Sequence, residues 1–104
     1  MTEQEQLFFS IGQKFEKAQQ SQMFGKPCFK INGKAFICFF QHEMVFKLSG
    51  ESHKEALQLI GSQLFDPSGQ NRPMKEWVQI SYDNCGKWEY FANEAIKYVN
   101  NEVC

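Results

Sequence analysis

An Asn-Gly dipeptide at positions 32–33 limits the possible folds more than any other feature, because it separates two apolar runs. Asn and Gly readily take the positive φ angles that a two-residue hairpin turn requires at both positions. The runs Phe29–Ile31 and Lys34–Phe40 are therefore predicted to be antiparallel neighbours. Gln41-His42-Glu43 is a weaker turn signal, and Met44–Leu48 follows as a third strand. The predicted unit is a three-stranded meander.

The two-residue turn also sets the register of the hairpin. Ile31 is expected opposite Lys34 and, counting back in step, Cys28 opposite Ile37. One face would then carry Phe29, Ile31, Phe36, Cys38 and Phe40, and the other Cys28, Ala35, Ile37 and Phe39. Both faces are apolar, so both need a cover. Helices are expected to cover one face. The other face is covered either by the remaining helices or the 65–73 loop, or by a protein partner or a second copy of this chain.

Helices are predicted before and after the meander. Thr-x-x-Glu at 2–5 has capping-box spacing, and the apolar positions after it indicate an amphipathic helix over about 3–20. Ser-x-x-Glu at 52–55 repeats this spacing after the third strand. The short helix that it begins is expected to end near Gly61, since glycine is common just beyond a helix.

The rest of the chain adds a loop, a strand and a helix. Residues 65–73 have the composition of a loop, and Met74–Ile80 is predicted to be a fourth strand. Asp83-Asn84 begins a last helix with the apolar stripe Trp88, Phe91, Ala92, Ala95, Ile96 and Val99. The order αβββαβα predicts a single α+β domain over 1–104, with three helices and an antiparallel sheet of about four or five strands.

Charge and composition exclude several classes of function. The chain is 42% hydrophobic and 22% charged, which is an ordinary globular balance. A net charge of −1 gives no global attraction to nucleic acid or to anionic lipid. The first twenty residues lack the features of a signal peptide, and no apolar run approaches the ~20 residues that span a bilayer. We therefore expect a cytoplasmic protein without membrane contact, whose four cysteines are free thiols.

The residues give little support to catalysis or metal binding. His42 and His53 fall at turn and helix-start positions, outside any zinc-ligand spacing. Cys28 and Cys38 are the closest cysteine pair, and the predicted register puts them on opposite faces, where neither a disulfide nor a shared metal is easy. The scattered glycines form no phosphate-binding loop. The prediction is a protein that is not an enzyme and holds no cofactor and no metal.

The start of the fourth strand is the most informative segment for binding. Arg72 ends the loop, and Lys75 and Trp77 alternate onto the face opposite Met74, Val78 and Ile80. A cation beside an aromatic ring on a sheet face can stack on a base or hold a peptide. Lys30 and Lys47 would add cations if the strand order brings them to the same face. The alternative is an edge strand protected by Lys75, with Trp77 packed under a loop.

Four short motifs follow one another along the chain. They are Met23-Phe24-Gly25, Asn32-Gly33-Lys34-Ala35-Phe36, Val45-Phe46-Lys47 and Arg72-Pro73-Met74-Lys75-Glu76-Trp77-Val78. Their order and spacing resemble the N-terminal domain of the TfoX/Sxy competence-regulator family. The stretch 26–31, together with Lys47 and Trp77-Val78, is similar to the related MmcQ/YjbR-like proteins. The resemblance covers about 23–99. It implies a curved antiparallel sheet packed by helices and a regulatory, non-enzymatic role.

Two departures from the family pattern limit what the resemblance implies. Full-length regulators of this family carry a second, C-terminal domain, and only the first resembles this sequence. Gln41-His42 also replaces an Asp-Gly type of turn. Competence regulation itself is therefore not expected here.

Three functional hypotheses follow from the sequence. The first is a stand-alone regulatory or protein-interaction module of the TfoX N-terminal type, which binds an unknown protein partner or forms a homodimer. The second is a weak, salt-dependent nucleic-acid-binding protein. The third is a small-molecule pocket walled by Phe side chains. The candidate binding residues are Phe24, Gly25, Lys30, Lys47, Arg72, Lys75 and Trp77.

Overall fold

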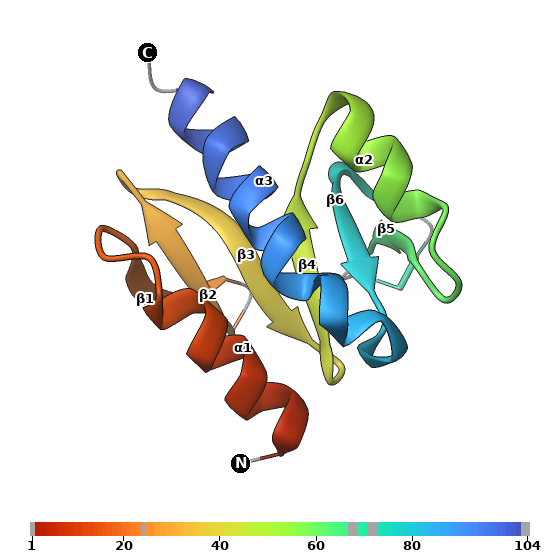
Figure 1. The fold of residues 1–104 in the computed structure, drawn as a ribbon, viewed down its shortest axis with the longest axis horizontal. Helices are drawn as coiled ribbons and strands as arrows, with labels where there is room; N and C mark the ends of the chain where they lie inside the picture. Colours follow the sequence, from red (N-terminus) through yellow and green to blue (C-terminus); the bar gives the residue numbers. More distant parts are fainter. Residues whose placement is uncertain (1, 24, 67–68, 71–72, 103–104) are drawn as a thin grey trace.

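The computed structural model describes residues 2–23, 25–66, 69–70 and 73–102 (Figure 1). Its elements are α1 (Glu3–Gln13), β1 (Gln19–Met23), β2 (Lys26–Ile31), β3 (Lys34–Phe40), β4 (Glu43–Lys47), α2 (Gly50–Leu57), β5 (Gln63–Phe65), β6 (Met74–Ile80), the 3₁₀ helix η1 (Tyr82–Lys87) and α3 (Trp88–Glu102). Six strands form one antiparallel sheet in the order β1-β2-β3-β4-β6-β5. The predicted α+β fold is confirmed, with more strands than the expected four or five.

The helices α1, α2 and α3 lie on the same face of the sheet, with α3 between the other two (Figure 1). α3 contacts β3 and β4 in the middle of the sheet, while α1 contacts β3 and α2 contacts β6. We call the opposite side of the sheet the second face. The buried side chains that gather there come from strands alone in the described part of the chain.

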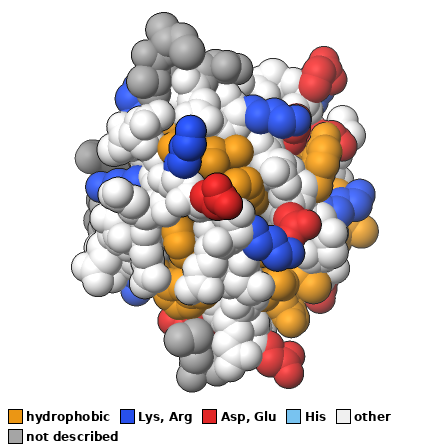
Figure 2. Space-filling view, turned by 60° about the vertical axis from the view of Figure 1, so that its left-hand side comes forward, with side chains coloured by type: hydrophobic (Ala, Val, Ile, Leu, Met, Phe, Trp, Pro, Cys, Tyr) orange, Lys and Arg blue, Asp and Glu red, His pale blue; other side chains and the backbone are white. Residues whose placement is uncertain are grey.

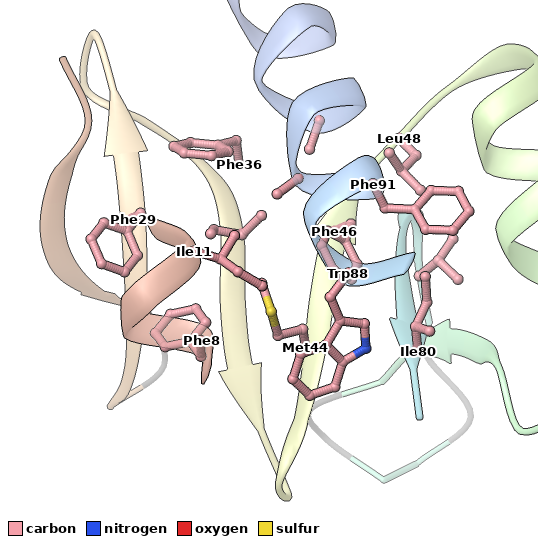
Figure 3. Close-up of a cluster of buried hydrophobic side chains, with 14 of the residues drawn as sticks. Phe8, Ile11, Phe29, Phe36, Met44, Phe46, Leu48, Ile80, Trp88 and Phe91 are labelled. Carbon is pink, nitrogen blue, oxygen red and sulfur yellow. The ribbon is translucent and has the colours of Figure 1, made fainter. Parts of the chain in front are cut away.

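The main core lies between the helices and the sheet, and it is rich in aromatic rings (Figure 3). The ring centroids of Phe8 and Phe29 are 5.3 Å apart, and those of Phe46 and Phe91 are 6.1 Å apart. The apolar stripe predicted for the last helix faces this core, with buried members Trp88, Phe91, Ala92, Ala95 and Val99. Aromatic residues bury large areas, which is how a chain of 104 residues fills one core.

The first helix is shorter than the predicted 3–20. Its N-terminus is as expected, since the Glu5 N–H donates to Thr2 Oγ1 at 3.1 Å. The helix ends at Gln13, and the chain continues in tight turns in which the Ala18 N–H donates to the Phe15 carbonyl. Phe15 and Ala18 nevertheless pack against the core. The turns after Gln13 have nearly the pitch of a helix, so they keep Phe15 and Ala18 on the side that faces the core. The helical spacing of apolar residues therefore continues beyond the end of the helix.

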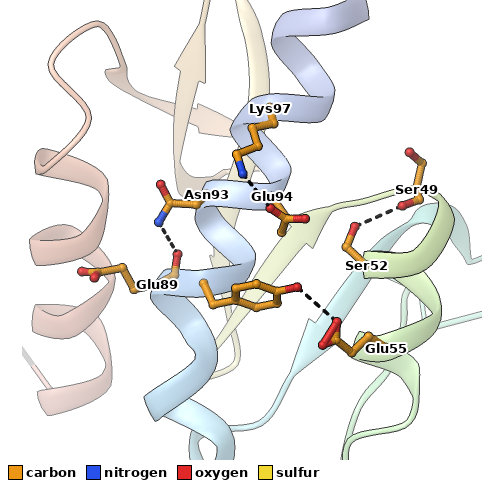
Figure 4. Close-up of polar contacts among 8 residues, drawn as sticks. Ser49, Ser52, Glu55, Glu89, Asn93, Glu94 and Lys97 are labelled. Atoms are coloured by element: carbon orange, nitrogen blue, oxygen red, sulfur yellow. Dashed lines mark hydrogen bonds and ion pairs between the residues drawn. The ribbon is translucent and has the colours of Figure 1, made fainter.

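The second helix also differs from its prediction. Its N-cap is Ser49, and Ser52 lies inside the helix with its Oγ donating to the Ser49 carbonyl at 3.0 Å (Figure 4). The helix ends before Ile60, which is 90% exposed. Leu64 has a helical spacing from Ile60 but pairs with Val78 in the sheet. Sheet pairing therefore determines the conformation of this segment.

The last helix begins later than Asp83-Asn84. Those residues lie in η1, where Asn84 has the non-helical angles φ −104° and ψ 22°. The Asn84 side-chain amide donates to the Ile60 carbonyl at 2.9 Å and so binds to a distant segment. Farther along, the Tyr90 hydroxyl donates to Glu55 at 3.1 Å and links α3 to α2 (Figure 4).

A β-bulge in the first hairpin corrects the predicted register. The pairs nearest the Asn-Gly turn form as expected, but the register shifts between Phe29 and Lys30. Phe29 consequently pairs with Ile37, and Phe36 is the extra residue on β3. Phe36 and Ile37 both pack into the helix-side core. One added residue therefore lets two consecutive apolar side chains face the helices.

The strand beyond the bulge has its faces reversed relative to the prediction. Phe39 joins the helix-side core, while Cys38 and Phe40 belong to the second face. Cys28 pairs directly with Cys38. The expectation that these cysteines lie on opposite faces is therefore wrong, because a single-residue shift reverses the alternation of side chains along a strand.

Two strands were absent from the sequence prediction. β1 has the sequence Gln-Gln-Ser-Gln-Met and lacks the apolar alternation that marks a strand. It forms because all five of its residues pair with β2. β5 is only three residues long and pairs with β6. In both strands, pairing with a neighbour outweighs the weak local preference.

The second hairpin turn gives a first testable prediction. Gln41 and His42 have φ angles of +52° and +65°, in the left-handed region that costs a side-chain-bearing residue roughly 1 kcal/mol or more. His42→Gly should therefore raise the free energy of unfolding by about 0.5–1 kcal/mol in urea titrations. The reciprocal control is Gly33→His, which should lower the free energy of unfolding because Gly33 has φ +79°. Nothing lies within 4 Å of a Cβ atom there, so a steric clash would not contribute to the loss. A change in the free energy of unfolding that has the same sign in both variants would contradict this account.

Candidate functional site

Five of the seven candidate binding residues lie in the described part of the chain, whereas Phe24 and Arg72 lie outside it. Gly25 is in the exposed turn between β1 and β2, with φ +74°. Lys30 on β2 pairs with Ala35, which packs on the second face. Because directly paired residues share a face, Lys30 extends from the second face as well.

The other three candidates lie on β4 and β6. Lys47 pairs with Trp77, but its Nζ lies 5.9 Å from the ring centroid of Tyr98 on α3. Lys75 is exposed, and its backbone carbonyl accepts a hydrogen bond from His53 Nε2 at 2.7 Å. Strands β3 and β4 separate β2 from β6 in the sheet, so Lys30 is not a neighbour of Trp77. The structure therefore does not gather these cations around the indole.

Trp77 is buried rather than displayed. Its side chain is only 6% exposed, and its ring centroid lies 6.4 Å from that of Phe65, which in turn lies 5.2 Å from Phe40. The strand that carries Trp77 is also no edge strand, since β6 lies between β4 and β5. A ring packed in this way leaves no open face for a base.

The second face is covered by its own small cluster of side chains. We call this the second cluster; its buried members are Cys28, Cys38, Val45, Phe65 and Trp77. Met74 packs against it too, so the expectation that Met74 shares a face with Val78 and Ile80 is wrong. Phe65, at the end of β5, supplies cover from the start of the predicted 65–73 loop. Lys26 Nζ lies 5.9 Å from the ring centroid of Phe40 on the same face.

The titratable groups of the described residues include no metal-binding cluster, and their two fully buried thiols have raised pKa values. No three His, Cys, Asp or Glu side chains come close enough there to hold a metal ion. Burial raises the pKa of the Cys28 thiol, which the nearby Lys30 ammonium partly offsets. Burial also raises the pKa of Cys38 strongly, and its neighbour Cys28 adds to this rise. At neutral pH both groups are thiols with little nucleophilic character.

The surface that stands out is the outer edge of β1. This strand is at one end of the sheet and, among the described residues, pairs with β2 alone. An edge strand presents backbone N–H and C=O groups that can pair with another strand. Proteins commonly block such edges with Lys or Pro, yet Gln19–Met23 contains neither and carries no charge.

A hollow of about 540 Å³ lies beside this edge, between α1 and β1. Its lining is mostly uncharged: Gln6, Phe9, Ser10, Gln13, Lys14 and Gln20. Lys14 forms an ion pair with Glu89 of α3. Figure 2 turns the left-hand side of Figure 1 towards the reader and shows scattered charged side chains and apolar patches among uncharged side chains and backbone. We call β1 and this hollow the β1 edge.

The opposite edge of the sheet is less suited to pairing. β5 has only three residues, and its register with β6 shifts between Leu64 and Phe65. A short, irregular strand offers few aligned backbone groups, which is one way in which proteins protect an edge. The two ends of the sheet are therefore unequal, and β1 is the more open one.

Sequence reasoning missed the β1 edge because it missed the strand. The available signal was weak: the run Ala18–Met23 carries no charge in a chain that is 22% charged. That run could not reveal an edge, because the position of a strand in a sheet depends on its pairing partners.

Comparisons of the chain with family models, with curated proteins and with solved structures found no significant match. Among the described residues, none of the helices combines the length and the apolar character needed to cross a membrane.

Proposed function

We propose that this chain is a non-enzymatic protein-interaction module of the TfoX N-terminal type, that it acts in the cytoplasm, and that the β1 edge is its interaction surface. The observation that carries this proposal is a five-residue edge strand with neither charge nor proline. Strand addition at such an edge supplies main-chain hydrogen bonds, and adjacent hollows select side chains. Here the hollow between α1 and β1 would accept the partner's neighbouring side chains.

The proposed partner is a second copy of this chain. A two-fold axis at Ser21 places Gln19 opposite Met23, Gln20 opposite Gln22, and Ser21 opposite itself, so all of β1 is paired. Self-pairing of a charged edge would bring like charges together, and the uncharged β1 avoids that cost. Glutamine amides both donate and accept hydrogen bonds, so they are complementary to themselves. Closed two-fold dimers are also the commonest homo-oligomers.

Burial of Trp77 is the reason for preferring protein over nucleic acid as the partner. The nucleic-acid hypothesis needs Trp77 as a stacking platform beside clustered cations, and the indole is only 6% exposed. Fluorescence anisotropy with duplex and single-stranded DNA at low and near-physiological salt tests that alternative. Saturable, salt-sensitive binding that is lost in Arg72→Ala with Lys75→Ala would reinstate it.

Light scattering over a range of micromolar concentrations tests the dimer. The mass should rise from the 12.2 kDa of one chain towards twice that value. Gln20→Lys with Gln22→Lys should keep the protein monomeric, because lysines would face each other across the two-fold axis. The matched control is Gln63→Lys, which adds a lysine to the opposite edge strand and should leave dimerisation unchanged.

Two outcomes would contradict a dimer formed through the β1 edge. A wild-type protein that stays monomeric throughout would exclude self-pairing. If affinity capture from a lysate then recovers another protein, and the Gln20→Lys, Gln22→Lys variant loses it, the β1 edge is correct and the partner is a different chain. Dimerisation that Gln63→Lys abolishes and the β1 variant does not would move the interface to the β5 end.

A further inference from the structure

Cys28 and Cys38 lie directly opposite each other on β2 and β3. In an antiparallel pair, directly opposite residues have Cα atoms about 4.5 or 5.5 Å apart, depending on whether they are hydrogen-bonded. Both spacings fall within the ~4.4–6.8 Å that a disulfide spans. The Cα spacing of this pair is therefore compatible with a direct link, and the Cβ spacing fits best if the pair is of the closer, non-hydrogen-bonded kind.

The bulge is what aligns the two thiols. Without the shift between Phe29 and Lys30, Cys28 would pair with Ile37, and Cys38 would point to the helix side. With it, both cysteines belong to the second cluster, at 0% and 1% exposure. Cys85, the other cysteine that the structure describes, packs against the helix-side core and so lies across the sheet from them.

We propose that Cys28 and Cys38 are a redox modification site, which closes to a cross-strand disulfide on exchange with a small-molecule disulfide such as glutathione disulfide. The Cys28 thiolate attacks one sulfur of the oxidant, forms a mixed disulfide and releases one thiolate. The Cys38 thiolate then attacks Cys28 Sγ and displaces the second. Two electrons pass to the small disulfide, and the two protons lost by the cysteines convert the released thiolates to thiols.

The surroundings indicate which thiol reacts first and how fast. Only Cys28 has a cation, Lys30, that opposes the effect of burial on its pKa, so Cys28 is the first nucleophile. Both thiols are buried, so an oxidant reaches them only when this part of the sheet opens. Exchange should therefore be slower than at an exposed thiol and should speed up as pH rises. The product would join β2 to β3 and hold the hairpin closed.

The test uses the full chain with Cys85→Ser and Cys104→Ser, so that only the pair remains. After incubation with glutathione disulfide, intact mass spectrometry should show the loss of two hydrogen atoms and no retained glutathione. Proteolytic digestion should then give peptides joined by a disulfide between Cys28 and Cys38. Cys38→Ser should instead retain one glutathione. The oxidised protein should unfold at a higher urea concentration than the reduced protein, and a thiol reductant should reverse the change.

A control variant with the second thiol moved by one residue tests whether the disulfide requires the direct pairing of positions 28 and 38. Ile37→Cys with Cys38→Ser moves the second thiol to the helix side of the bulge, so no internal disulfide should form. Circular dichroism checks that each variant is folded. Retained glutathione on the intact pair would overturn the proposal. So would a folded protein that stays reduced under conditions that oxidise its urea-unfolded form, or an internal disulfide in this control variant. The proposal stands independently of what binds the β1 edge.

Discussion

Gly12→Ala is expected to lower the free energy of unfolding by about 2 kcal/mol, although alanine normally stabilises a helix by up to ~1 kcal/mol relative to glycine. Gly12 lies in α1 where the helix meets Phe29 of β2. A Cβ atom there would lie 2.1, 2.3 and 2.4 Å from three atoms of the Phe29 ring, far closer than van der Waals contact. The ring cannot easily move, because Phe29 is 2% exposed and packs against Phe8 and Phe9.

Urea unfolding of three variants measures this effect. Gly86→Ala is the matched control, since nothing lies within 4 Å of a Cβ at Gly86, and its stability should stay within about 0.5 kcal/mol of wild type. Phe29→Leu combined with Gly12→Ala should cost less than the sum of the two single changes, because the smaller side chain makes room for the methyl group. A stabilising Gly12→Ala would show that α1 does not dock closely on Phe29.

Phe65→Ala should cost about 3 kcal/mol and open the second face to water. Phe65 is 1% exposed and packs between Phe40 and Trp77 on a face without a covering helix in the described chain. Removing its ring leaves a cavity and uncovers the indole of Trp77. Ile60→Ala is the control: this side chain is 90% exposed, so its loss should change stability by less than about 0.5 kcal/mol.

Tryptophan fluorescence identifies the face that opens. Trp88→Phe leaves Trp77 as the only tryptophan. In that background, Phe65→Ala should shift the emission to longer wavelength under conditions where the protein remains folded. An unchanged spectrum would mean that another segment covers Trp77.

The sequence predicted the parts of the fold that depend on local pattern. The Asn32-Gly33 turn, the strand Met74–Ile80 and the apolar stripe that begins at Trp88 are all present. Each of these has a strong local signal: a turn dipeptide, an alternating run or a helical stripe. The helix boundaries were less accurate, because turns after Gln13 continue the helical spacing.

The parts that depend on pairing could not be predicted in the same way. The polar strand β1 forms by pairing with β2, and nothing in Gln-Gln-Ser-Gln marks it as a strand. Neither a turn residue nor a glycine indicates the bulge at Phe29–Lys30 in the sequence. The bulge nevertheless reverses the faces on which Cys38 and Phe40 lie. The candidate site changed for the same reason. For Trp77 the sequence left open an exposed sheet face or packing under a loop, and the side chain is buried. The β1 edge follows from the strand order.

Hydrogen exchange of the β1 backbone amides, measured at low and high protein concentration, tests the central claim most directly. If β1 pairs with a second copy, the amides of Gln19–Met23 that point away from β2 should exchange more slowly as concentration rises, and those of β5 should not change. The Gln20→Lys, Gln22→Lys variant should lose this dependence. Exchange at β1 that is independent of concentration, in a sample that light scattering shows to be dimeric, would contradict the claim that the β1 edge is the interface.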